Sequence, residues 1–145
     1  MNEEFGSKLL KQTARIHFPF ILVFGIYVVV HGHYSPGGGF QGGVLLSMAI
    51  ILLDLIWGPN SPLKISYSKL IKIGALGILF YYAIGAYSFV WGKNFLDYSA
   101  LSTHYTDHPG EIRALGSFGI ELGVTLTVFS TLVLIYKKLQ EGPRH

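Results

Sequence analysis

Four apolar runs constrain the fold of this chain more than any other feature of its sequence. They cover about residues 17–34, 40–57, 70–91 and 114–136. A helix needs roughly 20 apolar residues to cross the hydrocarbon core of a bilayer. The last two runs have that length, and the first two reach it by including part of the segment that joins them. The pattern predicts an all-α integral membrane protein with four transmembrane helices, built as a single domain over residues 1–145.

The composition agrees with a lipid environment and excludes several classes of site. Charged residues make up 13% of the chain, against about 25% in soluble domains. The net charge of +3 comes from clusters between the apolar runs, so nucleic-acid binding is not indicated. The absence of cysteine excludes disulfides, thiolate metal sites and iron–sulfur ligation. We expect no cofactor.

Basic side chains lie mostly on one side of the predicted spans. Nine of the eleven precede the first span, separate the second from the third, or follow the fourth: Lys8, Lys11, Arg15, Lys64, Lys69, Lys72, Lys137, Lys138 and Arg144. The other two, Lys93 and Arg113, lie between the third and fourth spans. Because cytoplasmic loops carry an excess of Lys and Arg, we expect both termini in the cytoplasm of a prokaryotic cell and residues 93–111 outside the plasma membrane.

This outer segment contains His104, Asp107 and His108, whose spacing would suit a metal site on a helix face. The alternative is a solvated loop in which Asp107 or His108 caps the last helix, just before Pro109 and Gly110. We interpret the segment as this loop and expect no metal site.

The segment between the first two spans is the most distinctive part of the sequence. Pro36 disfavours a helix at the preceding residue, and the glycines that follow permit positive φ and close backbone approach. One interpretation is a tight turn that lets two helices pack. The other is a functional site, in which free amides at the start of the second helix face an anion or water. The motif comprises Ser35, Pro36, Gly37, Gly38, Gly39, Phe40, Gln41, Gly42 and Gly43.

Glu121 is the strongest single candidate for a functional residue. A carboxylate inside a membrane span is costly, and it is a functional-site hypothesis by default. Ser117 and Thr125 lie four residues before and after it, and the three form a polar stripe on one helix face. Glu121 is either a site of ion or proton movement or a structural hydrogen-bond anchor, and the residues alone leave both open.

The opposite face of the same predicted helix carries Gly116, Gly119 and Gly123, which we call the glycine face. Small residues at this spacing let membrane helices approach closely. Neither the glycine face nor the polar stripe suits contact with lipid. We expect other subunits to cover both.

Three further polar residues are candidates for an ion or proton path. His31 and His33 end the first span and can titrate near neutral pH, although residues two apart on a helix point in different directions. Asp54 lies near the cytoplasmic end of the second span. For the two histidines the alternative is interfacial hydrogen bonding, and for Asp54 it is an interfacial carboxylate that reaches headgroup water or Lys64.

The sequence resembles a known family at two places. The run from Gly32 to Gly43, which reads GHYSPGGGFQGG, resembles the MrpB-type (also called MnhB-type) subunit of Mrp-type multi-subunit sodium/proton antiporters. The run GIELGV from Gly119 to Val124 is a second match. The resemblance implies a small non-catalytic subunit that packs beside other Mrp-type membrane subunits and helps to line a path for Na⁺ or H⁺.

The resemblance leaves the complex open. Related subunits occur in free-standing antiporters and in membrane-bound complexes with hydrogenase or ferredoxin-oxidoreductase subunits. Two alternatives remain beside it: a self-contained small channel or transporter that forms a homo-oligomer, and a purely structural assembly subunit. Nothing in the sequence indicates an enzyme acting alone.

Overall fold

The computed structural model describes residues 8–32, 38–101 and 108–141, and four long helices account for most of them. These are α1 (Lys8–His31), α2 (Gly38–Trp57), α3 (Tyr67–Val90) and α4 (Pro109–Glu141). Two short 3₁₀ helices, η1 (Gly58–Asn60) and η2 (Tyr98–Leu101), lie in the connections. All four long helices are apolar and long enough to cross a membrane, which confirms the predicted all-helical architecture.

Two of the helices extend well beyond the apolar runs. α1 begins at Lys8, where the hydrophobic pattern starts at about residue 17, and α4 continues for 33 residues to Glu141. The extensions carry the charged side chains that flank the runs. Hydropathy marks the stretch that suits hydrocarbon, whereas a helix can continue into the headgroup region, where water solvates its charges.

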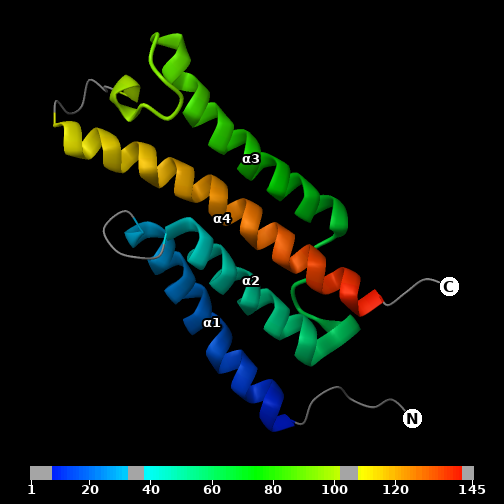
Figure 1. Cartoon of the computed structure of the whole chain (residues 1–145). Helices are drawn as coiled ribbons and strands as arrows, with labels where there is room; N and C mark the ends of the chain where they lie inside the picture. The colour runs from blue at the N-terminus through cyan, green and yellow to red at the C-terminus, as the bar shows by residue number, and fades with distance from the viewer. Residues whose placement is uncertain (1–7, 33–37, 102–107, 142–145) are drawn as a thin grey trace.

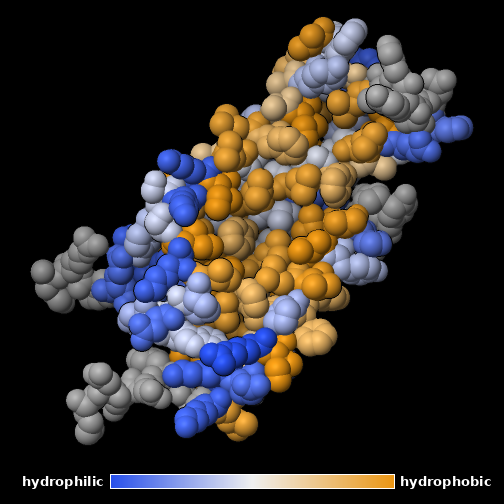
Figure 2. Space-filling view, turned by 180° about the vertical axis from the view of Figure 1, so that it is seen from behind, coloured by the Kyte–Doolittle hydropathy of each residue, from blue (hydrophilic) through white to orange (hydrophobic). Residues whose placement is uncertain are grey.

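The helices lie in a row in the order α1, α2, α4, α3 (Figure 1). α2 packs against α1 on one side and α4 on the other, while α3 packs against α4. α1 and α3 therefore form the edges of the row and leave large apolar side chains uncovered, among them Phe20, which is 70% exposed, and Leu79, which is 64% exposed. Figure 2 shows the result as a broad apolar band with hydrophilic residues gathered at its ends.

Small residues allow the central helices to approach closely. A Cβ added at Gly77 of α3 would lie 2.6 Å from the carbonyl oxygen of Gly123 in α4. A Cβ at Gly43 of α2 would lie 2.9 Å from the carbonyl oxygen of Thr125, also in α4. Such backbone-to-backbone packing is typical of membrane helices, whose association cannot rely on the hydrophobic effect.

The connection after α3 folds back onto the helices. The Ser88 hydroxyl donates to the carbonyl of Asp97 at 3.0 Å, and the amide of Leu96 donates to the carbonyl of Gly85 at 3.3 Å. These bonds hold the connection against the end of α3, and the ring of Tyr98 in η2 lies next to Gly116 of α4. An aromatic side chain from this connection therefore covers the first turns of α4.

Candidate functional site

Glu121 lies where the end of α1, the start of α2 and the N-terminal half of α4 meet. A Cβ at Gly38 would lie 3.2 Å from both Cδ and Oε1 of Glu121, and a Cβ at Gly32 would contact the Glu121 carboxylate and the backbone of Gly38. At Gly39 a Cβ would collide with the main chain of Glu121. The carboxylate therefore lies beside main chain that is accessible only because these residues have no side chains.

Gly38 has a φ of +73°, in the left-handed region that glycine adopts without steric cost. It is the first residue of α2, and the first four amides of a helix lack partners within the helix. Together with the helix dipole, these amides make a helix N-terminus attractive to negative charge. The N-terminal end of α2 therefore lies beside the carboxylate of Glu121.

Thr125 joins the same two helices one turn further along α4. It is buried, and its hydroxyl lies 3.1 Å from the carbonyl of Gly39 and 2.7 Å from the carbonyl of Glu121, within donating distance of both. Ser117, the third residue of the polar stripe, is half-buried and lies beyond the start of α2. The stripe is therefore covered by α2 at Glu121 and Thr125 and opens into a groove at Ser117.

The glycine face of α4 packs against α3 and the connection that follows it. A Cβ at Gly119 would lie 2.5 Å from Cδ1 of Ile84, and one at Gly123 would lie 2.8 Å from the carbonyl oxygen of Gly77. The expectation that other subunits cover both faces of this helix is wrong for these positions. α4 lies between α2 and α3 (Figure 1), an order of helices that hydropathy does not specify.

Asp54 forms a second polar site at the opposite end of α2. Its carboxylate lies 3.5 Å from Nζ of Lys137 on α4, and the two side chains are 8% and 19% exposed. The alternative in which Asp54 reaches Lys64 is corrected, because the ion pair is made across the α2–α4 contact, although Lys64 lines the same cavity. At about 1.5 Å per residue, Lys137 lies roughly 24 Å along α4 from Glu121.

The hydroxyl groups between these two sites bond within their own helices. Ser47 donates to the carbonyl of Val44 at 2.7 Å, Thr127 to that of Gly123 at 2.9 Å and Ser130 to that of Thr127 at 3.0 Å. Their donors are used locally rather than in a chain of bonds along the interface. Within the described part of the molecule, Glu121 and Asp54 are therefore separate sites.

The remaining candidates lie at the end of α1, just before α4 or outside the described residues. His31 is exposed, stacks on Tyr27 with ring centroids 4.1 Å apart, and has Nδ1 3.3 Å from the Tyr27 carbonyl. His108 is exposed, and its carbonyl accepts from the amides at the start of α4. No cluster of three potential metal ligands occurs among the described residues. The expectations for His33, Tyr34, Ser35, Pro36, Gly37, His104 and Asp107 fall outside the described residues.

Sequence reasoning did not identify two residues of these sites. Lys137 is one of several interfacial charges in the sequence, and no local pattern links it to Asp54. Tyr98 lies in a connection without a recognisable motif. Burial raises the pKa of Tyr98, and the charges of Tyr81 and Glu121 raise it further, which places the phenol within electrostatic reach of the carboxylate.

Comparison with known proteins gives the family. Residues 9–134 match a family described as a domain related to the MnhB subunit of Na⁺/H⁺ antiporters. A Bacillus subtilis protein named as the B-type subunit of a Na⁺/H⁺ antiporter is 32% identical over 142 residues, which cover 91% of this chain and 97% of that protein. A protein of Staphylococcus epidermidis named as antiporter subunit mnhB2 is 34% identical over 137 residues, which cover 92% of this chain and 94% of that protein.

An archaeal protein shares a shorter stretch. An uncharacterized protein of Methanocaldococcus jannaschii is 42% identical over 76 residues, which cover 52% of this chain and 29% of that protein. The family match contains Glu121, Asp54 and the glycines at the start of α2, whereas Lys137 lies just beyond it. With a matched region that spans all four helices, the chain belongs to the family of MnhB-related subunits of Na⁺/H⁺ antiporters.

Proposed function

We propose that this chain is the MnhB-type membrane subunit of a multi-subunit Na⁺/H⁺ antiporter and that Glu121 takes part in moving protons or cations through it. The observation that carries the proposal is the position of the Glu121 carboxylate, inside a membrane-spanning helix and beside the backbone at Gly32 and Gly38. Ionisable groups at such depth are rare and mark ion pathways.

The packing of α2 on α4 at this level is made by other atoms. Gly39 lies on the main chain of Glu121, and the Thr125 hydroxyl lies within hydrogen-bond distance of the carbonyl of Gly39. Neither contact involves the carboxylate. The carboxylate itself lies beside the start of α2 at Gly38, so this geometry fits both an anchor and a site of ion movement, and the proposed role rests on the depth of the ionisable group.

The proposed assembly follows from the exposed edges of the helix row. α1 and α3 present large apolar side chains outward, and these suit lipid or the helices of other antiporter subunits. With both termini in the cytoplasm, Glu121 lies towards the outer side and the Asp54–Lys137 pair towards the cytoplasm. The localisation that follows is the plasma membrane of a prokaryote.

The proposal includes both a free-standing antiporter and a module attached to a redox complex. Copurification with the affinity-tagged chain separates them, because hydrogenase or ferredoxin-oxidoreductase subunits would accompany it in the second case. Recovery of this chain alone, as a homo-oligomer, would instead support a self-contained channel or transporter.

Substitution of Glu121 tests the role of the carboxylate. Gln keeps much of the hydrogen bonding and removes the titratable charge, so we expect assembled Glu121→Gln complexes to exchange Na⁺ for H⁺ at least roughly tenfold more slowly. Glu121→Asp should retain partial activity. The assay is collapse of a pH gradient by added Na⁺ in membrane vesicles, with complex assembly followed in the same preparation.

The matched control is Glu141→Gln, which removes a carboxylate near the other end of α4, where Glu141 bonds to Tyr67 and Lys138. This control should exchange at the rate of the unmodified complex. An anchor role predicts the opposite pattern, in which Glu121→Gln is almost silent and Glu121→Leu loses assembly. Normal exchange by an assembled Glu121→Gln complex would refute the proposed role of the carboxylate in ion movement.

A further inference from the structure

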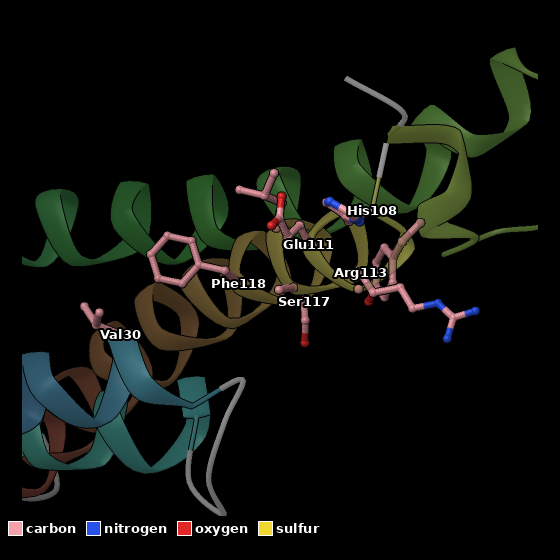
Figure 3. Close-up of a pocket in the computed structure, with 10 residues that line it drawn as sticks. Val30, His108, Glu111, Arg113, Ser117 and Phe118 are labelled. Carbon is pink, nitrogen blue, oxygen red and sulfur yellow. The ribbon is translucent and has the colours of Figure 1, made fainter. Parts of the chain in front are cut away.

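An open groove of about 1010 Å³ lies at the N-terminal end of α4 and extends along it as far as Ser117 and Phe118 (Figure 3). Its walls come from the last turn of α1, the first three turns of α4 and η2. The lining residues that matter here are Val30, Tyr98, Glu111, Ala114, Ser117 and Phe118. Of the predicted candidates, Ser117 and His108 line this groove.

The groove exists because α4 is longer than the helix beside it. The first turn of α2 meets α4 at Glu121, whereas α4 begins twelve residues earlier, at Pro109. At about 1.5 Å per residue, roughly 18 Å of α4 extends past the start of α2. Val30 of α1 lines this stretch, two residues before the glycine that lies beside the Glu121 carboxylate.

The lining of the groove on α4 ends at Ser117 and Phe118, about one turn before Glu121. Gly110, Ala114 and Ser117 line the groove, and Glu121 follows Ser117 by one turn on the same side of the helix. These three residues are small, whereas Phe118 and Val30 line the groove beside Ser117 with larger side chains. The face of α4 that α2 covers at Glu121 is therefore open in the N-terminal turns of α4, before the start of α2.

We propose that this groove is the outer entry site through which a hydrated monovalent cation reaches Glu121. The inference rests on the proposed function, and it adds the route and the residues that line it. Oxygen atoms suited to a hard cation come from the hydroxyl groups of Ser117 and Tyr98 and, at the mouth, from the carboxylate of Glu111. The guanidinium of Arg113 points away from Ser117, Phe118 and Val30 (Figure 3).

The size of the groove allows a cation to enter it with its water. A volume of about 1010 Å³ holds many water molecules at about 30 Å³ each, so the ion need not lose its hydration shell at the mouth. The phenol of Tyr98 is neutral at physiological pH, as for an ordinary tyrosine with a pKa of about 10, and its oxygen can face the ion. Glu111 is exposed and draws cations by its charge.

Cysteine chemistry tests the route, because the chain contains no native cysteine. Ala114→Cys is placed in the full chain, assembled with its antiporter subunits in right-side-out vesicles, and treated from outside with a cationic methanethiosulfonate. We expect the modification to lower Na⁺/H⁺ exchange at least fivefold relative to the same vesicles before treatment. We also expect external Na⁺ to slow the modification itself.

Val90→Cys is the matched control. Val90 ends α3 on the outer side and is 78% exposed, and it does not line the groove. It should react with the same reagent without loss of exchange. If Ala114→Cys reacts from outside without loss of exchange, or fails to react while Val90→Cys does, the entry site is overturned. The second result would mean that another subunit fills the groove.

A second measurement does not depend on the cysteine variant folding. Glu111→Gln removes one exposed charge at the mouth, worth about 0.4 kcal/mol at 10 Å in water, so the Na⁺ concentration for half-maximal exchange should rise about twofold at low ionic strength. The difference should vanish in high salt. An unchanged value at low ionic strength contradicts the inference. Glu121→Gln decides the proposed function independently, so either idea can fail while the other stands.

Discussion

Alanine at Gly39 would place a methyl group against the backbone of the neighbouring helix. Its Cβ would lie 2.8 Å from the carbonyl carbon of Glu121 and 2.9 Å from its Cα. Atoms of a helix backbone cannot rotate aside, so α2 would have to move away from α4 by roughly 1 Å. Overpacking of this kind costs about 1–3 kcal/mol, and the bond from Thr125 to the Gly39 carbonyl, 3.1 Å long, contributes about 1 kcal/mol more.

Alanine also favours the helix by up to about 1 kcal/mol relative to glycine, so the net destabilisation should be about 1–3 kcal/mol. Two other Gly→Ala variants serve as references for this destabilisation. At Gly74 the added Cβ would lie 2.6 Å from the Ser130 hydroxyl oxygen, which can rotate at the cost of its bond to Thr127. At Gly110 the added Cβ meets nothing within 4 Å.

The assay is the temperature at which the detergent-solubilised complex loses its monodisperse gel-filtration peak. We expect the midpoint to fall most for Gly39→Ala, less for Gly74→Ala and not at all for Gly110→Ala. A Gly39→Ala complex as stable as Gly110→Ala would refute the reasoning. It would show that α2 does not rest on the backbone of α4 at Glu121 in the assembled protein.

Three further predictions concern the ends of the molecule. Lys137→Leu leaves the buried carboxylate of Asp54 without its cation and should destabilise the protein by roughly 3 kcal/mol. The double variant with Asp54→Leu should recover most of this loss in the same thermal assay, and an equally unstable double variant would count against the pair. Lys93→Cys should react with a membrane-impermeant maleimide in intact cells, whereas reaction only after permeabilisation would reverse the proposed orientation. Hydrogen bonds from the hydroxyl and amide of Ser99, at 2.6 and 3.0 Å, lower the pKa of Asp97 below its ordinary value of 3.8. The stabilisation from this carboxylate is therefore present above about pH 4 and is lost as the pH falls through the lowered pKa. Amides 97–101 of the unmodified chain should be better protected from hydrogen exchange than those of Asp97→Asn at pH 7 and equally protected near pH 2. Equal protection at pH 7 would contradict this account.

Local properties of the chain follow from neighbouring residues alone. The number of helices is given by the length of the apolar runs, because each run must satisfy its backbone within itself in lipid. The same holds for the two faces of α4, since positions three and four apart share a face whatever the helix packs against. The polar stripe and the glycine face are consequences of spacing alone.

What covers those faces was decided by contacts between distant segments. Thr125 and Gly39 lie 86 residues apart in the sequence and meet across the α2–α4 contact. Hydropathy gives no order of helices in a row. For this reason we expected other subunits to cover both faces of α4, and Lys137 was not predicted as the partner of Asp54. Lys137 lies about four helical turns beyond Glu121, and its neighbours in the sequence do not indicate which helix will pack beside it.

The sequence by itself therefore determined the helices, their polar and glycine faces and the presence of a carboxylate at membrane depth. The tertiary structure decided that the carboxylate lies beside the glycine backbone at the start of α2 and that α4 extends past α2 to leave a groove above it. The physical reason is that hydrophobicity and helix periodicity are properties of neighbouring residues. Close packing instead depends on matching surfaces of segments that the chain brings together only when it folds.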